Sequence, residues 1–246
     1  MTFWLKLAIG LLCVTTTLAG QNIPPGSTLP VVLNSSLDAR KDKPGTKIQG
    51  RLKQDVPLPA GAKIKSGSRV SGHIVSVTKP SGSGSRMVLQ FDQVENEGKT
   101  IPLNVSGRAI ADSNSIYSAQ IPIDAESNYE TENQWTMRQV GGDIVNRGRG
   151  VVASGNAIVG HYAGAVWAKL AYVSGCPPSE VGNGEQPMWV FSVDACGVYG
   201  LRDLKLAGAG DTDPLGQIVL ESEKNVDIGG GSGWLLIVNA APLATH

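Results

Sequence analysis

Charged side chains are scarce in this chain. Asp, Glu, Lys and Arg make up 17% of its 246 residues, against about a quarter in an ordinary soluble protein. Acidic and basic residues are balanced at 21 each, which argues against a surface that attracts nucleic acid or an anionic membrane. Surface helices need Glu, Lys and Arg, so their shortage and the 31 glycines favour strands and turns.

Histidine is also scarce, which limits acid–base chemistry. His73 alternates onto the solvent side of a strand, His161 follows a glycine in a turn, and His246 ends the chain. There is no G-x-S-x-G elbow, and the residues after Asp211–Asp213 do not continue a calcium-binding loop. We therefore predict no catalytic residue, no metal site and no cofactor.

Long apolar runs are absent after the first twenty residues. Lys6 precedes the apolar run Leu7–Val14, and Thr17–Ala19 has the small residues of a cleavage site. Residues 1–20 are thus predicted to be a signal peptide, with an uncleaved anchor as the alternative. We expect no transmembrane span after processing and export to the periplasm, the outer envelope or the extracellular space.

Only two cysteines remain once the signal peptide and its Cys13 are removed. Cys176 and Cys196 are expected to pair in an oxidising compartment. The bridge would add roughly 3 kcal/mol by restricting the unfolded chain. Two free buried thiols are the alternative, whereas zinc is disfavoured because the sequence has no C-x-x-C pair.

Apolar residues alternate with polar ones through the first half of the mature chain. The alternation is clear in Thr28–Asn34 and around Met87, Leu89 and Phe91. It is longest in Ile101–Ala109, where Arg108 falls on the polar side and is expected to face solvent. Short strands joined in sequence by glycine-containing turns predict an all-β fold, an antiparallel barrel or sandwich.

The pattern changes over residues 111–150, predicted to be a polar insertion or linker. Its Glu126–Gln139 stretch is the best helix candidate in the mature chain, although a surface loop fits better. The candidate contacts for a ligand or partner lie in this region or at its end: Trp135, Arg138, Arg147 and Arg149.

Strand patterns resume from residue 151. The strongest are Ala165–Val173, Trp189–Val193, Ile218–Glu221 and Trp234–Val238. Residues 21–110 are predicted to form an N-terminal β-meander, and 151–246 a C-terminal β region that carries the disulfide. Pairing of the last strands with the meander would make one domain, and two subdomains are the alternative.

Part of the chain resembles a known family. Leu58–Gly72, with its Pro-Ala-Gly turn and its Gly-Ser-Arg-Val-Ser-Gly strand, is similar to a segment of TrbI-type channel proteins of conjugation and type IV secretion, and so is Thr100–Leu103. The likeness covers residues 25–110 and implies the C-terminal β-barrel of that family.

The whole chain resembles a group of uncharacterised exported bacterial β-rich proteins, through Gln139–Asp143 and Trp189–Gly197. These observations predict a non-enzymatic envelope or secreted module for assembly or protein interaction, with envelope proteins as partners. A glycan-binding module is one alternative, since Trp135 is expected to be exposed. A hydrolase that uses carboxylates such as Asp194 and Asp203 is the other.

Overall fold

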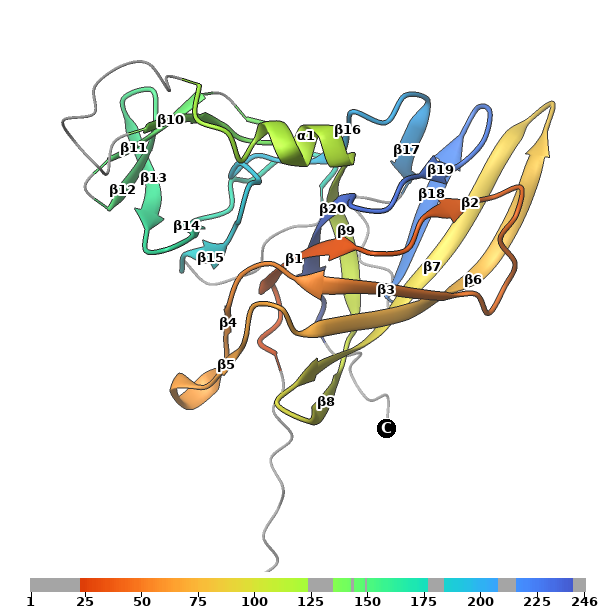
Figure 1. Cartoon of the computed structure of the whole chain (residues 1–246), viewed down its shortest axis with the longest axis horizontal. Helices are drawn as coiled ribbons and strands as arrows, with labels where there is room; N and C mark the ends of the chain where they lie inside the picture. Colours follow the sequence, from red (N-terminus) through yellow and green to blue (C-terminus); the bar gives the residue numbers. More distant parts are fainter. Residues whose placement is uncertain are drawn as a thin grey trace, which may run out of the picture.

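The computed structural model describes residues 23–123, 135–142, 144–148, 150–176, 184–207 and 216–240. The fold is all-β, as predicted, and is dominated by one large curled sheet (Figure 1). Its ten strands are β1 (Thr28–Leu33), β3 (Lys47–Leu52), β6 (Arg69–Ser81), β7 (Gly84–Asn96), β8 (Lys99–Pro102), β9 (Val105–Ala111), β16 (Gly197–Tyr199), β17 (Leu204–Ala207), β18 (Gln217–Ser222) and β20 (Gly233–Val238).

The large sheet nearly closes into a barrel. Its strand order is β16-β9-β20-β1-β3-β6-β7-β18-β17, with β8 paired to β7, and the end strands β16 and β17 approach each other. The strands pair antiparallel except β16 and β9, which run parallel. Because β20 pairs with β1 and β18 with β7, the last strands of the chain complete a sheet that the first strands begin.

A smaller lobe stands beside the barrel (Figure 1). Its six-stranded sheet follows chain order: β10 (Trp135–Arg138), β11 (Ile144–Gly148), β12 (Val151–Ser154), β13 (Ala157–Tyr162), β14 (Val166–Ala168) and β15 (Gln186–Pro187). Helix α1 (Ser113–Ser118) follows β9 and leads toward this lobe. Two short pairs complete the structure, β2 (Leu37–Asp38) with β19 (Asp227–Ile228), and β4 (Val56–Pro57) with β5 (Lys63–Ile64), beside the 3-10 turn η1 (Pro59–Gly61).

The barrel core follows the predicted alternation. Strand β3 is exposed and buried at successive positions, and Met87, Leu89 and Phe91 are fully buried. Phe91 meets Trp234 edge to face, with their ring centroids 5.9 Å apart. The period of two therefore identifies the inner face correctly in these strands.

A tight glycine-containing turn joins β7 and β8. Glu97 and Gly98 both have positive φ, 51° and 78°. This conformation matches the twist of the two flanking strands, and Gly98 adopts it without steric cost. The β6–β7 hairpin also has a tight end, because β6 extends to Ser81 and β7 begins at Gly84.

The helix and strand predictions in the second half need correction. Strand β10 is formed by residues 135–138, which lie near the end of the helix candidate. Strand β11 is formed by residues 144–148, expected in an insertion or linker. The remaining part of the helix candidate up to residue 134 lies outside the described residues. Only Val166–Ala168 of the predicted strand Ala165–Val173 forms a strand, β14. The predicted strand Trp189–Val193 is a turn, from which Phe191 forms an isolated bridge to Val140.

The expectation that Arg108 faces solvent is wrong. Every residue of β9 is buried, and Arg108 is 1% exposed. Its neighbour Ala109 packs with Leu235 of β20 into the core of the smaller lobe. Since the lobe covers the outer side of β9, this strand has no solvent face.

Candidate functional site

An open pocket of about 470 Å³ lies where the barrel meets the smaller lobe. The barrel contributes the residue after β3, the chain after α1 contributes one wall, and β10, β13, β14 and the turn after β15 form the rest. The lining residues are Lys53, Ala119, Gln120, Pro122, Met137, Tyr162, Gly164, Ala165, Val166, Trp189 and Val190.

Buried Gln54 of the barrel connects two walls of this pocket. Its Nε2 donates to the carbonyl oxygen of Val166 at 2.8 Å, and its Oε1 accepts from the backbone N–H of Trp189 at 2.8 Å. Both ends of one amide are therefore satisfied. Strand β15 of the lobe is also bonded to the barrel, because Thr28 Oγ1 of β1 donates to the carbonyl of Pro187 at 2.6 Å.

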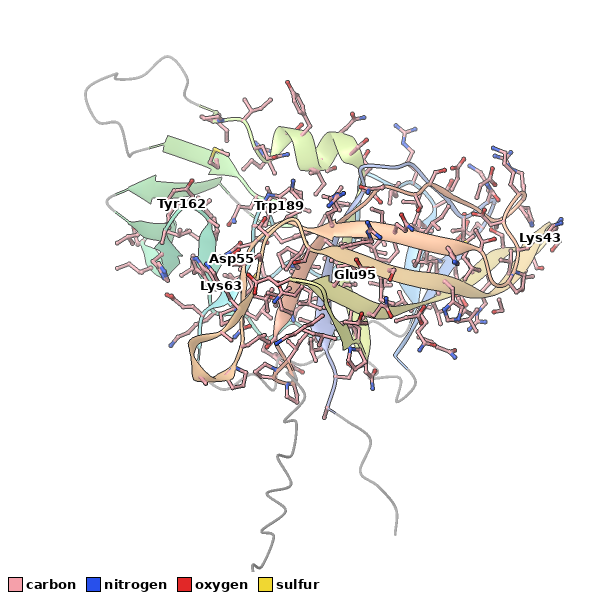
Figure 2. The ribbon with its side chains drawn as sticks, turned by 60° about the horizontal axis from the view of Figure 1, so that its bottom comes forward. Lys43, Asp55, Lys63, Glu95, Tyr162 and Trp189 are labelled. Atoms are coloured by element: carbon pink, nitrogen blue, oxygen red, sulfur yellow. A yellow bond between two sulfur atoms is a disulfide. The ribbon has the colours of Figure 1, made fainter. Side chains whose placement is uncertain are left out.

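Trp189 is held in an unusual backbone conformation beside the pocket. Its φ is 47°, a left-handed value that bulky residues rarely adopt. The ring is half-buried, meets Phe191 edge to face at a centroid distance of 6.5 Å, and has the Lys53 ammonium 5.4 Å from its centroid. Figure 2 labels Trp189 at the junction and Tyr162 on the lobe. A fixed aromatic surface with a cation above it can hold an apolar group that carries a negative charge.

Large apolar side chains are exposed next to the pocket. Tyr117 of α1 is 67% exposed, Ile121 43% and Ile123 46%. Exposed Pro122 lies among them and also lines the pocket. The backbone here is fixed, since the N–H of Ile123 donates to the carbonyl of Thr136 in β10 at 2.9 Å. We name Tyr117, Ile121, Pro122 and Ile123 the α1 patch.

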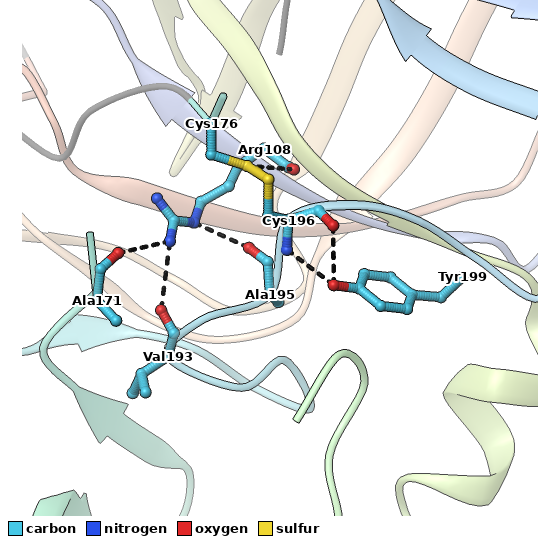
Figure 3. Close-up of a disulfide and its surroundings, with 7 residues drawn as sticks. All are labelled: Arg108, Ala171, Cys176, Val193, Ala195, Cys196 and Tyr199. Atoms are coloured by element: carbon cyan, nitrogen blue, oxygen red, sulfur yellow. Dashed lines mark hydrogen bonds between the residues drawn. A yellow bond between two sulfur atoms is a disulfide. The ribbon is translucent and has the colours of Figure 1, made fainter. Parts of the chain in front are cut away.

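The predicted disulfide between Cys176 and Cys196 is confirmed (Figure 3). It lies beside Arg108, whose Nε donates to the carbonyl of Ala195 at 3.0 Å. Arg108 Nη2 donates to the carbonyls of Ala171 at 2.8 Å and Val193 at 3.3 Å. Burial lowers the pKa of Arg108, while the nearby Asp194 carboxylate opposes that shift. Arg108 thus ties lobe backbone to the barrel and belongs to the scaffold.

The predicted contact residues are only partly placed. Arg138 is exposed on β10, and the backbones of Trp135 and Arg147 stand opposite each other in the β10–β11 ladder. The side chains of Trp135 and Arg147, and the whole of Arg149, lie outside what the structure describes.

The sequence pattern does not identify Lys53, Tyr162 and Trp189 as pocket residues, or Gln54 as the residue that holds two pocket walls. The pattern predicts Trp189 in a strand, whereas it lies half-buried in a turn beside the pocket. Gln54 gives no local signal, because it stands between the charged residues Lys53 and Asp55, yet the fold buries it. Its two partners are 112 and 135 residues away, so no local pattern identifies them.

Both described histidines pair with carboxylates. His73 Nδ1 is 2.9 Å from Asp92 Oδ2 across the β6–β7 ladder. His161 Nδ1 contacts Glu185 Oε2, and its ring stacks on Trp167. His161 lies in strand β13 rather than in the predicted turn, and His246 is outside the described residues.

The candidate hydrolytic carboxylates have separate partners. Asp194 accepts from the Ser192 hydroxyl at 2.6 Å, and Asp203 accepts from Lys224 at 2.9 Å. Asp211 and Asp213 lie outside the described ranges. Among the residues that the structure does describe, no three His, Cys, Asp or Glu side chains are grouped to hold a metal ion.

A scan against protein-family models and a search of the curated proteins found no match for this chain. In the described part of the chain, no helix has the length and apolar character needed to cross a membrane.

Proposed function

We propose that this protein is an exported, non-enzymatic β-module that serves assembly or protein interaction in the cell envelope, in the manner of the C-terminal barrel of TrbI-type channel proteins. The observation that carries the proposal is the α1 patch. Three large apolar side chains, each 43–67% exposed, gather beside an open pocket. Grouped apolar exposure of this kind marks interaction surfaces, whereas single exposed apolar residues are ordinary.

The disulfide supports export. Cys176 and Cys196 are bonded, and such bonds persist in oxidising compartments. Mass spectrometry of the mature protein should find a chain that begins near Gly20 or Gln21. An intact Met1–Lys6 end on the protein recovered from the envelope would contradict signal-peptide removal.

Site-specific photo-crosslinking in the producing cell tests the interaction itself. A photoreactive residue at Ile121 or Ile123 should give one dominant crosslink to an envelope protein. Ile158 is the matched control, an isoleucine of β13 that is 75% exposed and lies outside the patch. Adding Tyr117→Asp should remove the patch crosslinks. Equal crosslinking from Ile158, or none from either patch position, would reject the proposal.

A further inference from the structure

We propose that the pocket at the junction binds a peptide segment of the partner, through a bulky apolar residue next to a carboxylate. The carboxylate would come from an Asp or Glu side chain or from a free C-terminus. The inference rests on the proposed interaction function and deepens it, because it names the chemistry of the group that the pocket takes.

The apolar half of this recognition comes from the pocket walls. Met137, Val166 and Val190 are at most 4% exposed and line the pocket from beneath. Tyr162 and Trp189 add half-buried aromatic rings. A volume of about 470 Å³ lies within the usual range of preformed small-ligand sites, about 300–1,000 Å³. One large side chain with its flanking backbone fits such a space.

The charged half comes from Lys53. Lys53 is the only Asp, Glu, Lys or Arg residue among the described residues that line the pocket. Its ammonium is kept over the Trp189 ring, 5.4 Å from the centroid, so the cation and the aromatic surface are presented together. A carboxylate beside an apolar side chain complements that arrangement. A neutral sugar would need several hydrogen-bonding side chains, and most of this lining is apolar.

The pocket is held in shape before any ligand enters. Gln54 hydrogen-bonds both the Trp189 and the Val166 backbones. The left-handed φ of Trp189 persists because these surroundings impose it, and backbone strain of this kind concentrates at functional sites. Preorganised walls lower the ordering cost of binding.

Fluorine NMR on the full mature chain labelled with 5-fluorotryptophan tests the inference. Trp189→Phe assigns the Trp189 signal, and the signal of the buried Trp234 reports that each variant is folded. The probes are N-acetyl-L-phenylalanine and its neutral amide, which differ only in the carboxylate. The acid should shift the Trp189 signal with a Kd on the order of 1 mM, and the amide should bind about fivefold or more weakly.

Substitutions at lysine separate charge recognition from general binding. Lys53→Met and Lys53→Gln should make the acid and the amide bind equally weakly. Lys79→Met is the matched control, because Lys79 is also exposed but lies on β6, away from the pocket lining. That variant should keep the wild-type preference.

Three results would overturn the inference. They are equal binding of acid and amide to the wild-type chain, an unchanged preference in both Lys53 variants, and a larger Trp189 shift from N,N′-diacetylchitobiose, which would make the pocket a glycan site. Patch crosslinks that survive such a result would leave the proposed function standing. If the patch crosslinks are absent but the pocket still prefers the acid to the amide, the proposed function is rejected and the recognition of a carboxylate by the pocket is retained.

Discussion

At the scale of single residues, position in the tertiary structure decides what each side chain does. Arg108 has the neighbours of a surface strand residue, yet it donates to three backbone carbonyls in the interior. Trp189 has the neighbours of a core strand, yet it forms part of an open pocket. In both cases the deciding contacts come from segments far away in sequence.

Arg108→Met should lower the free energy of unfolding by about 3 kcal/mol, because it leaves the carbonyls of Ala171 and Ala195 without this donor and removes one of the two donors to the carbonyl of Val193. Urea unfolding followed by fluorescence measures this. Arg51→Met is the matched control, since Arg51 also donates to a carbonyl, that of Gly67, but on the exposed surface. It should change stability by less than about 0.5 kcal/mol. Equal losses in the two variants would contradict the anchoring role.

Asp38 should make stability depend on pH. Asn225 donates to it at 2.9 Å and the Arg40 N–H at 3.0 Å, and these bonds lower its pKa well below the ordinary value, against the opposing effect of burial. A depressed pKa stabilises the fold above the unfolded pKa, about 4, and the stabilisation is lost as pH falls toward the folded pKa.

Asp38→Asn should therefore cost about 1–2 kcal/mol at pH 7, and the gap to the wild type should narrow below about pH 4. Urea unfolding at several pH values measures it. Asn225→Ala should reduce the pH-dependent gap, because it removes the largest cause of the shift. A gap that stays constant from pH 7 to about pH 3 would refute the assignment.

At the scale of elements, the strands with regular alternation are the ones that sequence predicts well. Strands β18 and β20 each extend the predicted strand by one or two residues. The apolar stretch after β15 fails as a strand because Gln54 holds the N–H of Trp189 in a turn. A side-chain contact from the barrel thus outweighs the local strand preference.

Close pairing of β6 and β7 depends on Gly72. A Cβ at this position would lie 2.1 Å from the carbonyl oxygen of Gln90, so Gly72→Ala should force the strands apart and cost about 3 kcal/mol of unfolding free energy. The control is Gly82→Ala in the same hairpin, where a Cβ would meet nothing within 4 Å. Comparable urea midpoints for the two variants would show that the strands adjust freely.

At the scale of the whole molecule, two hydrophobic cores pack against opposite faces of one pair of strands. Residues of β9 and β20 contribute to the barrel core through Ile110 and Trp234, and to the lobe core through Ala109 and Leu235. The disulfide lies at the junction beside Arg108, and both Arg108 and Gln54 donate hydrogen bonds to backbone carbonyls of the lobe. The pocket is a product of this arrangement, because its walls come from both parts.

Gln54→Ala should loosen the smaller lobe while the barrel stays intact. The substitution leaves the N–H of Trp189 without its acceptor and removes one of the two donors to the carbonyl of Val166, which keeps the N–H of Met188. Amides of β14 and β15 should therefore exchange about tenfold faster. Hydrogen exchange read by mass spectrometry measures this, with β6 and β7 peptides as the internal reference. Gln49→Ala, at an exposed position of β3, should leave both regions unchanged. Uniform acceleration across the chain would contradict a local role.

The β class, the cysteine pairing and the inner face of most barrel strands can all be predicted from the order of the amino acids alone. These follow from simple rules: side chains alternate along a strand, left-handed turns need residues such as Gly98, and the two cysteines after the predicted signal peptide have only each other to pair with. Only the tertiary structure decided which outer faces are covered. Burial of Arg108 and exposure of Trp189 depend on a lobe that folds against the barrel, and the bonds of Gln54 span more than a hundred residues. The local sequence pattern does not specify such long-range contacts, so the pocket could not be predicted from it.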